Sequence, residues 1–117
     1  MGHLAGMAKG SGLSARVKLD PIPILPGAWE LLQEGIAPGG THRNLSGLGD
    51  VMVWNPDLSQ EAKLLLCDAQ TSGGLLIAVA SDRTDSLLEK LRSHGVQGAQ
   101  VIGELMAGTP SRIEVFS

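Results

Sequence analysis

The sequence contains no tyrosine, and its aromatic side chains are only Trp29, Trp54 and Phe116. Proteins that bind single strands or RNA stack bases on aromatic rings, so this class of function is excluded. Nine basic and twelve acidic residues give a net charge of −3, and the basic ones form no stripe of the kind that a phosphate backbone requires. DNA is therefore not an expected partner.

Cysteine and long apolar runs are also scarce. Cys67 is the single cysteine and cannot form an internal disulfide, which fits a reducing compartment. The longest uncharged stretch, residues 69–81, is 13 residues long and falls short of the roughly 20 that span a bilayer. The first residues lack the basic and apolar regions of a signal peptide. We expect a soluble, cytoplasmic protein with no membrane partner.

Glycine, in contrast, is abundant, with 16 in 117 residues. The glycines cluster instead of recurring every third residue, which excludes collagen. With 43% hydrophobic and 18% charged residues the chain is not of the disordered class. Its length and the absence of an internal repeat or low-complexity linker predict a single domain over residues 1–117.

Four segments have apolar side chains at helical spacing. They are residues 4–8, which stop at residues 10–12, residues 25–36, residues 55–66, and a segment that opens at residues 81–82, has its apolar register at 84–91 and is closed by Gly95. Five segments are predicted as strands: 15–19, 51–54, 75–80, 99–105 and 112–116. Residues 75–80 are uniformly apolar, as in a central strand covered on both faces, and residues 38–50 are predicted as an irregular loop. These elements predict an α/β or α+β fold in which helices pack on a layered sheet.

Two glycine-rich loops, residues 38–44 and 67–76, are the candidate ligand-contacting segments. Paired glycines allow close approach of the backbone, free N–H groups in such turns bind anions, and Arg43 offers a planar cation for phosphate or carboxylate. Ordinary turn and capping chemistry explains the same residues, and no Walker or dinucleotide motif is present. The candidate residues near substrate or phosphate are Gly39, Gly40, Thr41, Arg43, Asn44, Thr71, Ser72, Gly73 and Gly74.

These loops carry a resemblance to a known family. Residues 68–76, Asp-Ala-Gln-Thr-Ser-Gly-Gly-Leu-Leu, resemble the Asp-Pro-Gln-Thr-Ser-Gly-Gly-Leu-Leu signature of the selenophosphate synthetases, also called selenide, water dikinases. Residues 38–44 resemble the Pro-Gly-Gly-Thr-x-Arg-Asn segment of the same family, and residues 2–12 resemble its Gly-His-Leu-x-x-Met-x-x-Gly-x-Gly helix. The match spans nearly the whole chain and is closer to the bacterial form. Ala69 departs from the pattern, because the family has proline there.

The resemblance implies a fold like the C-terminal domain of aminoimidazole ribonucleotide synthetase, with its first part lying before Met1. It also implies an enzyme that forms selenophosphate, AMP and phosphate from ATP, selenide and water, with Mg²⁺, for selenocysteine and selenium-modified tRNA. In that family the nucleophile and most metal-binding aspartates belong to an N-terminal ATP-binding domain, the expected missing partner. The full-length enzyme is expected to be a homodimer.

For this chain alone we expect no catalytic residue, no metal site, no bound ATP or Mg²⁺, and no selenophosphate synthesis. Phosphoryl transfer needs metals held by clustered carboxylates, whereas the acidic residues here are scattered singly. The alternative hypothesis is a stand-alone, non-catalytic module that retains the fold as a binding or assembly surface.

Four further residues are tempting as functional groups. Cys67 follows three leucines at the end of a predicted helix and is interpreted as a core residue and not as a nucleophile, with Asp68 beside it expected to raise its pKa. His3 has no metal partner at a suitable spacing and is expected to make a structural hydrogen bond. His94 is interpreted as a helix-end residue, and His42 receives no role.

Overall fold

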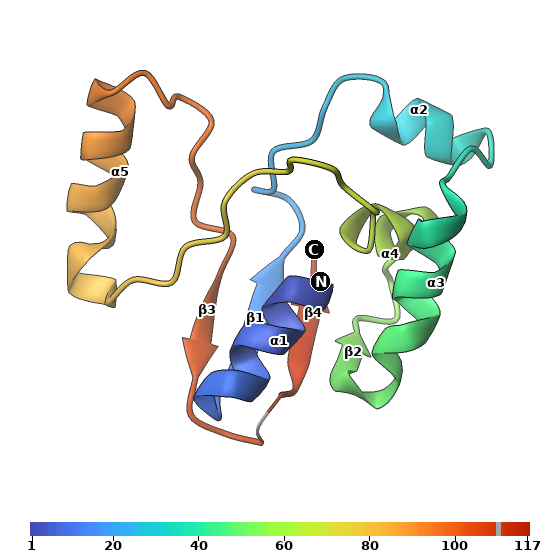
Figure 1. Ribbon diagram of the computed structural model, residues 1–117, viewed down its shortest axis with the longest axis horizontal. Coiled ribbons are helices and arrows are strands. Elements are labelled where there is room, and N and C mark those ends of the chain that lie inside the picture. The colour runs from blue at the N-terminus through green and yellow to red at the C-terminus, as the bar shows by residue number, and fades with distance from the viewer. Residues whose placement is uncertain (110) are drawn as a thin grey trace.

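In the computed structural model, which describes residues 1–109 and 111–117, a four-stranded mixed sheet forms the centre of the molecule (Figure 1). The strand order is β2-β4-β1-β3. Its strands are β1 (Ser14–Lys18), β2 (Met52–Trp54), β3 (Gly103–Met106) and β4 (Ile113–Phe116). β4 runs parallel to both β1 and β2, and β3 pairs with β1 in the antiparallel sense. The mixed α/β class predicted from the sequence is confirmed.

The core lies on one face of this sheet. α1 (Gly2–Ser11) and α4 (Gln60–Leu66) contribute apolar side chains to the same cluster as the inward-facing residues of β1, β2 and β4. Ile113, in β4, is completely buried. The buried members of the cluster are Leu4, Ala15, Val17, Met52, Leu58, Ala62, Leu66, Ile113 and Val115.

The opposite face of the sheet carries charges in a ladder. Because side chains alternate along a strand, Arg16 of β1 points away from the core. It pairs with Glu104 of β3 at 3.8 Å and Glu114 of β4 at 3.6 Å, and its guanidinium lies 5.1 Å from the ring centre of Phe116. These side chains are largely exposed, so each pair contributes less than about 1 kcal/mol.

The first two predicted helices are confirmed, with different lengths. α1 ends at Gly12, which takes a left-handed conformation with φ of 67° as a C-terminal cap. α2 (Ala28–Gln33) is shorter than the predicted 25–36 and contributes no buried residue. α4 begins five residues later than predicted, because the hydroxyl of Ser59 caps it by accepting a hydrogen bond from the Ala62 amide at 3.2 Å.

The prediction of an irregular loop over residues 38–50 is wrong. Residues Gly39–Leu48 form helix α3, and the single-turn helix η1 (Gly49–Val51) leads from it into β2. Glycine is unfavourable inside helices by about 1 kcal/mol each, which is why the sequence indicated a loop. Packing reverses that preference, because Thr41 is completely buried and α3 lies against α1 and α4.

The prediction of a central strand over residues 75–80 is also wrong. These residues form no regular element, and Leu75 is 91% exposed. They lead through η2 (Ser81–Arg83) into α5 (Thr84–Ser93), which has no buried residue. An apolar strand needs a hydrogen-bonding neighbour, and the described part of the chain supplies none at this place.

The helix predicted to open at residues 81–82 is confirmed, but residues 81–83 form the single-turn helix η2 and α5 itself begins at Thr84; Gly95 beyond it has a φ of 88°. β2 and β4 match their predicted positions, whereas β3 begins four residues later than the predicted 99–105. We call residues 70–102 the outer segment and residues 1–69, 103–109 and 111–117 the core region. In Figure 1 α5 stands at the left, apart from the other helices. None of the described helices is long and apolar enough to cross a membrane.

Candidate functional site

Thr41 joins the two glycine-rich loops. It lies in the first turn of α3, and its hydroxyl donates a hydrogen bond to Oδ1 of Asp68 at 2.8 Å. The hydroxyl oxygen of Thr41 in turn accepts a hydrogen bond from the backbone N–H of Ala69 at 3.2 Å. Two segments that are distant in sequence are thereby held together at the N-terminal end of α3.

Two neighbours reinforce this junction. Asn44, one turn further along α3, donates its side-chain N–H to the carbonyl oxygen of Cys67 at 3.0 Å. Gly40 lies so close to the turn that a Cβ placed on it would be 3.0 Å from the Cβ of Ala69. Gly40, Thr41 and Asn44 therefore have a structural role here, which is the turn-and-packing interpretation left open by the sequence.

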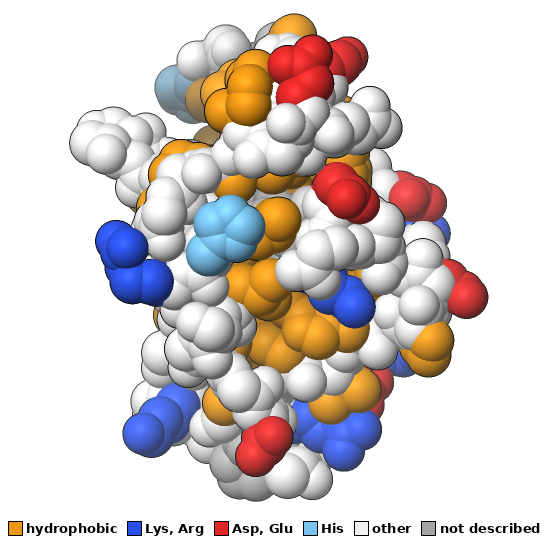
Figure 2. All heavy atoms as spheres, turned by 90° about the vertical axis from the view of Figure 1, so that its right-hand side faces the viewer, with side chains coloured by type: hydrophobic (Ala, Val, Ile, Leu, Met, Phe, Trp, Pro, Cys, Tyr) orange, Lys and Arg blue, Asp and Glu red, His pale blue; other side chains and the backbone are white. Residues whose placement is uncertain are grey.

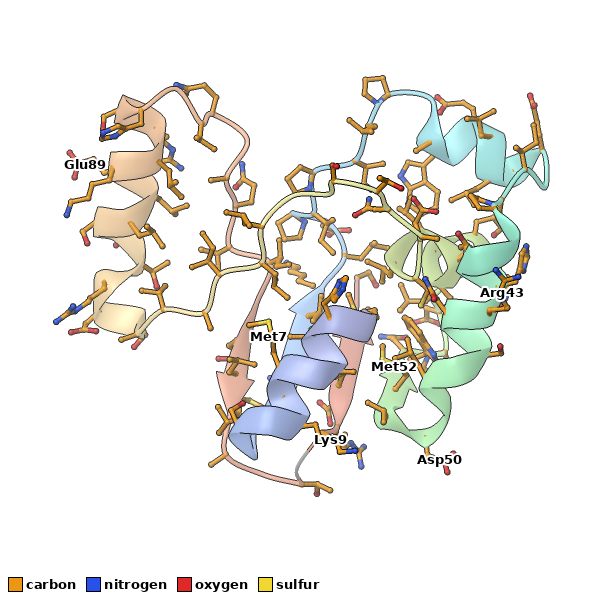
Figure 3. The ribbon with its side chains drawn as sticks, in the orientation of Figure 1. Met7, Lys9, Arg43, Asp50, Met52 and Glu89 are labelled. Carbon is orange, nitrogen blue, oxygen red and sulfur yellow. The ribbon has the colours of Figure 1, made fainter. Side chains whose placement is uncertain are left out.

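Arg43 is the exposed cation of the site. Its guanidinium folds back over the first turn of α3, 3.4 Å from where a Cβ on Gly39 would lie and 3.8 Å from one on Gly40. In Figure 3 its side chain lies on the outer surface of α3. Within residues 1–109 and 111–117 it forms no ion pair with a carboxylate. The cation is therefore available to an anion at the positive end of the helix dipole.

The second loop continues from this junction as an exposed turn. Thr71, Ser72, Gly73 and Gly74 are all solvent-exposed. Ser72 has a φ of 57°, a conformation that is uncommon for residues other than glycine. A Cβ on Gly73 would lie 2.7 Å from Oε1 of Gln70, so the Gln70 side chain lies close against this glycine.

Asp68 and Gln70 were missed as site residues. Asp68 accepts the Thr41 hydrogen bond that joins the loops, and Gln70 packs against the glycine pair. Both lie within the signature at residues 68–76. Hydrogen-bond donors and the Arg43 cation have evident ligand chemistry, whereas nothing in the sequence marks Asp68 as an acceptor. Ligand contact by the nine selected residues stays a prediction.

Cys67 is buried, with 2% of its surface exposed, between α4 and this turn. Burial raises the pKa of its thiol, and the nearby ammonium of Met1 opposes that shift only in part. The thiol is thus protonated at neutral pH and is a poor nucleophile. The sequence expectation that Asp68 causes the raised pKa is replaced by desolvation as the cause.

His94 and His42 add no metal site to the part of the chain that the structure describes. His94 caps the C-terminal end of α5, where its Nδ1 lies 2.8 Å from the carbonyl oxygen of Lys90, as expected of a helix-end residue. His42, in α3, is exposed. Among residues 1–109 and 111–117, no three side chains of His, Cys, Asp or Glu are grouped to hold a metal ion.

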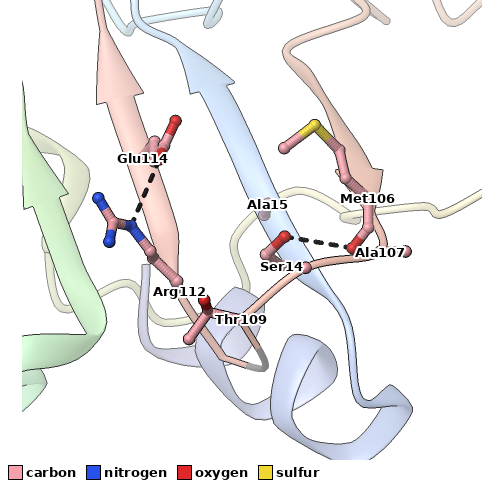
Figure 4. Close-up of a pocket in the computed structure, with 8 residues that line it drawn as sticks. Ser14, Ala15, Met106, Ala107, Thr109, Arg112 and Glu114 are labelled. Atoms are coloured by element: carbon pink, nitrogen blue, oxygen red, sulfur yellow. Dashed lines mark hydrogen bonds and ion pairs between the residues drawn. The ribbon is translucent and has the colours of Figure 1, made fainter.

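A shallow cavity of about 370 Å³ lies elsewhere, beside β1 and the turn before β4 (Figure 4). Ser14 donates a hydrogen bond to the carbonyl of Met106 at 3.2 Å, and Arg112 pairs with Glu114 at 3.3 Å on its wall. None of the residues that line it comes from the two glycine-rich loops. Because Ser14 and Arg112 already have partners on this wall, the loops remain the stronger candidate.

Figure 2 views the molecule from the side of α2 and α3. Figure 2 shows basic side chains scattered singly over this face, with hydrophobic ones gathered near its middle. Such a distribution lacks the continuous positive track on which a phosphate backbone lies. One exposed arginine can bind a single phosphate or carboxylate group.

Comparison with known proteins identifies the domain. Residues 1–116 match the family described as AIR synthase related protein, C-terminal domain. The chain belongs to this family. The selenide, water dikinase of Shewanella baltica is 44% identical over 95 residues, and that of Photobacterium profundum is 43% identical over 107 residues. These matches cover 81% and 91% of this chain.

The AIR synthase-like chain spans only part of those relatives. The matched segments make up 26% of the Shewanella protein and 30% of the Photobacterium protein. The resemblance to the selenide, water dikinases is therefore confirmed for the chain as a whole, and it concerns the C-terminal domain.

Proposed function

We propose that this chain is the C-terminal part of a selenide, water dikinase, which makes selenophosphate, AMP and phosphate from ATP, selenide and water. The observation that carries the proposal is the contact between Thr41 and Asp68. It joins the two segments that resemble the dikinase signatures into one site, although they are distant in sequence. Identity of 44% to a selenide, water dikinase supports the same assignment.

In this proposal Arg43 binds a phosphate group. Its guanidinium is exposed beside the first turn of α3, where backbone N–H groups and the helix dipole both favour an anion. Thr41 and Asn44 hold the turn in place, and residues 71–74 form the exposed wall next to it. Arg43 is thus a candidate binding residue, and Thr41 a positioning residue.

The nucleotide and the metal are assigned to the other part of the enzyme. Mg²⁺ is implied by the family resemblance, but the described side chains of this chain offer no group of ligands that fits it. No metal-dependent step is therefore derived from these residues. An N-terminal ATP-binding domain, a homodimeric full-length enzyme and a bacterial cytoplasmic location belong to the same proposal.

A chimeric enzyme tests the proposal. The matching segment of the Shewanella baltica protein is replaced by this chain, and AMP release that depends on ATP and selenide is measured. We expect the chimera to form selenophosphate and the 117-residue chain alone to be inactive. A folded, soluble chimera without activity would instead support the non-catalytic assembly module.

Arg43 is then tested inside the active chimera. Loss of a charge-assisted hydrogen bond to phosphate costs about 1.5–3 kcal/mol, so Arg43→Ala is expected to lower kcat/KM about 10- to 100-fold. Arg92→Ala is the matched control, because Arg92 is an exposed arginine in the last turn of α5. Equal effects of the two variants would show that Arg43 has no specific role in phosphate binding.

A further inference from the structure

A second cavity, of about 320 Å³, lies on the sheet face opposite the core. It is lined by Lys18 of β1 and Phe116 of β4, which are register partners, and by Val101 and Ile102, which lead into β3. Ligand cavities in proteins begin at about 300 Å³ and combine apolar walls with a few polar groups. None of the residues that line this cavity belongs to the two glycine-rich loops.

The cavity is built on the backbone of the sheet. The amide of Lys18 donates a hydrogen bond to the carbonyl oxygen of Ile102 at 2.8 Å, which ties β1 to the segment before β3. The next amide, that of Leu19, donates to the carbonyl oxygen of Phe116 at 2.8 Å. A Cβ on Gly103 would collide with the carbonyl oxygen of Arg16, so glycine allows the close approach of the two strands. A cavity held in this way is formed before a ligand arrives, which lowers the cost of binding.

Apolar side chains make up most of the cavity surface. Val101 is 50% exposed, and Ile102 and Phe116 are half-buried, so apolar area on all three remains open to a ligand. The guanidinium of Arg16 lies 5.1 Å from the ring centre of Phe116 and covers part of that ring. The remaining apolar surface fits a small ring, because aromatic rings pack favourably on one another in offset or edge-on contact.

Lys18 is the cation of this cavity that has no partner. Arg16 is held between Glu104 and Glu114, and Arg112 pairs with Glu114 on the same face. Within residues 1–109 and 111–117 the exposed Lys18 forms no ion pair with a carboxylate. These five side chains carry a net charge of +1, although the whole chain carries −3. The cavity therefore offers one positive charge beside an apolar surface.

We propose that this cavity binds a small aromatic monocarboxylate, with the ring against Phe116 and Ile102 and the carboxylate paired with Lys18. A single free ammonium matches a single negative charge, whereas a phosphate monoester carries about −1.5 to −2 at neutral pH. An exposed ion pair contributes little by itself. Binding therefore requires the ring and the charge in one molecule, and a rigid ring loses little conformational freedom when it is bound.

Titration of the isotope-labelled chain with phenylacetate, followed by amide chemical shifts, tests the proposal. We expect saturable shifts confined to residues 16–18, 101–104 and 114–116, with a dissociation constant of about 1 mM, as is typical of so small a ligand. Acetate, which lacks the ring, and phenethylamine, which carries the opposite charge, are the matched probes. Either probe binding as tightly as phenylacetate would overturn the proposal, and so would the absence of saturable shifts at tens of millimolar.

Three variants test the role of the cation. Lys18→Met keeps most of the side chain and removes its charge, so we expect binding about 5- to 10-fold weaker, whereas Lys18→Arg is expected to bind as the unaltered chain does. Lys9→Met is the matched control, because Lys9 is an exposed lysine in the last turn of α1, on the core side of the sheet. Equal effects of Lys18→Met and Lys9→Met would overturn the assignment.

The contribution of the ring is tested at Phe116. Phe116→Leu keeps apolar bulk but removes the aromatic contact, and we expect it to weaken phenylacetate about 2- to 10-fold. An unchanged affinity would overturn the placement of the ring, and the amide spectrum of each variant verifies that it is folded. The proposed enzymatic function does not bear on these results, because the chain is tested alone and without ATP or selenide.

Discussion

The core region and the outer segment are both rich in apolar side chains, yet only the first buries them. Ile113 of the core region is completely buried between neighbouring strands and helices, whereas Ile77 of the outer segment is half-exposed. Ile77 stands in a uniformly apolar stretch and Ile113 in one that alternates apolar and charged residues, and both patterns predict a strand. The difference lies in the partners: β4 is flanked by β1 and β2, and residues 75–79 have no hydrogen-bonded neighbour among the described residues. Composition therefore predicts the potential for a strand, and topology decides whether it forms.

The largest difference in the free energy of unfolding is expected between one substitution in the core region and one in the outer segment. Ile113→Ala is expected to lower the free energy of unfolding by about 2–5 kcal/mol, because it removes buried methyl groups and leaves a cavity. Ile77→Ala at low micromolar concentration is expected to change it by less than about 0.5 kcal/mol. Urea denaturation followed by tryptophan fluorescence measures both. Comparable losses would mean that the outer segment is packed as firmly as the core.

The next comparison is between two threonines, one from each glycine-rich loop. Thr41→Val removes the hydroxyl that serves Asp68 and Ala69 and is expected to cost about 1–3 kcal/mol. Thr71→Val, in the exposed turn, is the matched control and is expected to cost less than about 0.5 kcal/mol. Thermal or urea unfolding separates them. A Thr41→Val protein as stable as the control would contradict the junction between the loops.

A smaller effect is expected where this chain departs from the family pattern. Ala69→Pro restores the proline but removes the N–H that donates to Thr41, a loss of about 0.5–1.5 kcal/mol. Proline stiffens the unfolded chain and returns about 0.4–1 kcal/mol. The two effects nearly cancel, and we expect a change of less than about 1 kcal/mol in urea denaturation. A larger loss of stability would show that the backbone conformation at residue 69 is incompatible with proline.

The smallest effect is a pH dependence from Cys67. Burial raises the pKa of the thiol in the folded protein above its ordinary value. Between these two pKa values the unfolded chain has lost the proton and the folded one has kept it, so stability falls as the pH rises through the ordinary thiol pKa. Cys67→Ala removes this fall in stability from denaturation curves at alkaline pH, above the range in which the Met1 ammonium, whose pKa is lowered by burial, titrates. An unchanged slope in that variant would assign it to another group.

Much of the fold could be predicted from sequence because local patterns agree with packing there. Alternation at 15–19 and the glycine cap after α1 correspond to β1 and Gly12. The helix at Gly39–Leu48 could not be predicted, since three glycines argue against it and its support is the distant contact of Thr41 with Asp68. The exposure of residues 75–80 could not be predicted either, because the sequence of an apolar stretch does not show whether a neighbouring strand pairs with it.

The candidate site follows the same rule. The motifs selected the two glycine-rich loops, and the contact of Thr41 with Asp68 brings them into one neighbourhood. The acceptor role of Asp68 and the packing of Gln70 against Gly73 emerge only from three-dimensional contacts. Residues with evident ligand chemistry can be selected from sequence, whereas residues that hold them in position can be found only from three-dimensional contacts.

Amide hydrogen exchange of the dilute chain, read residue by residue, tests the contrast between the two regions most directly. The account predicts strong protection for the amides of β1 and β4, which form the centre of the sheet, and exchange near the unprotected rate for residues 75–79. Equal protection of both regions in the dilute chain would contradict the account.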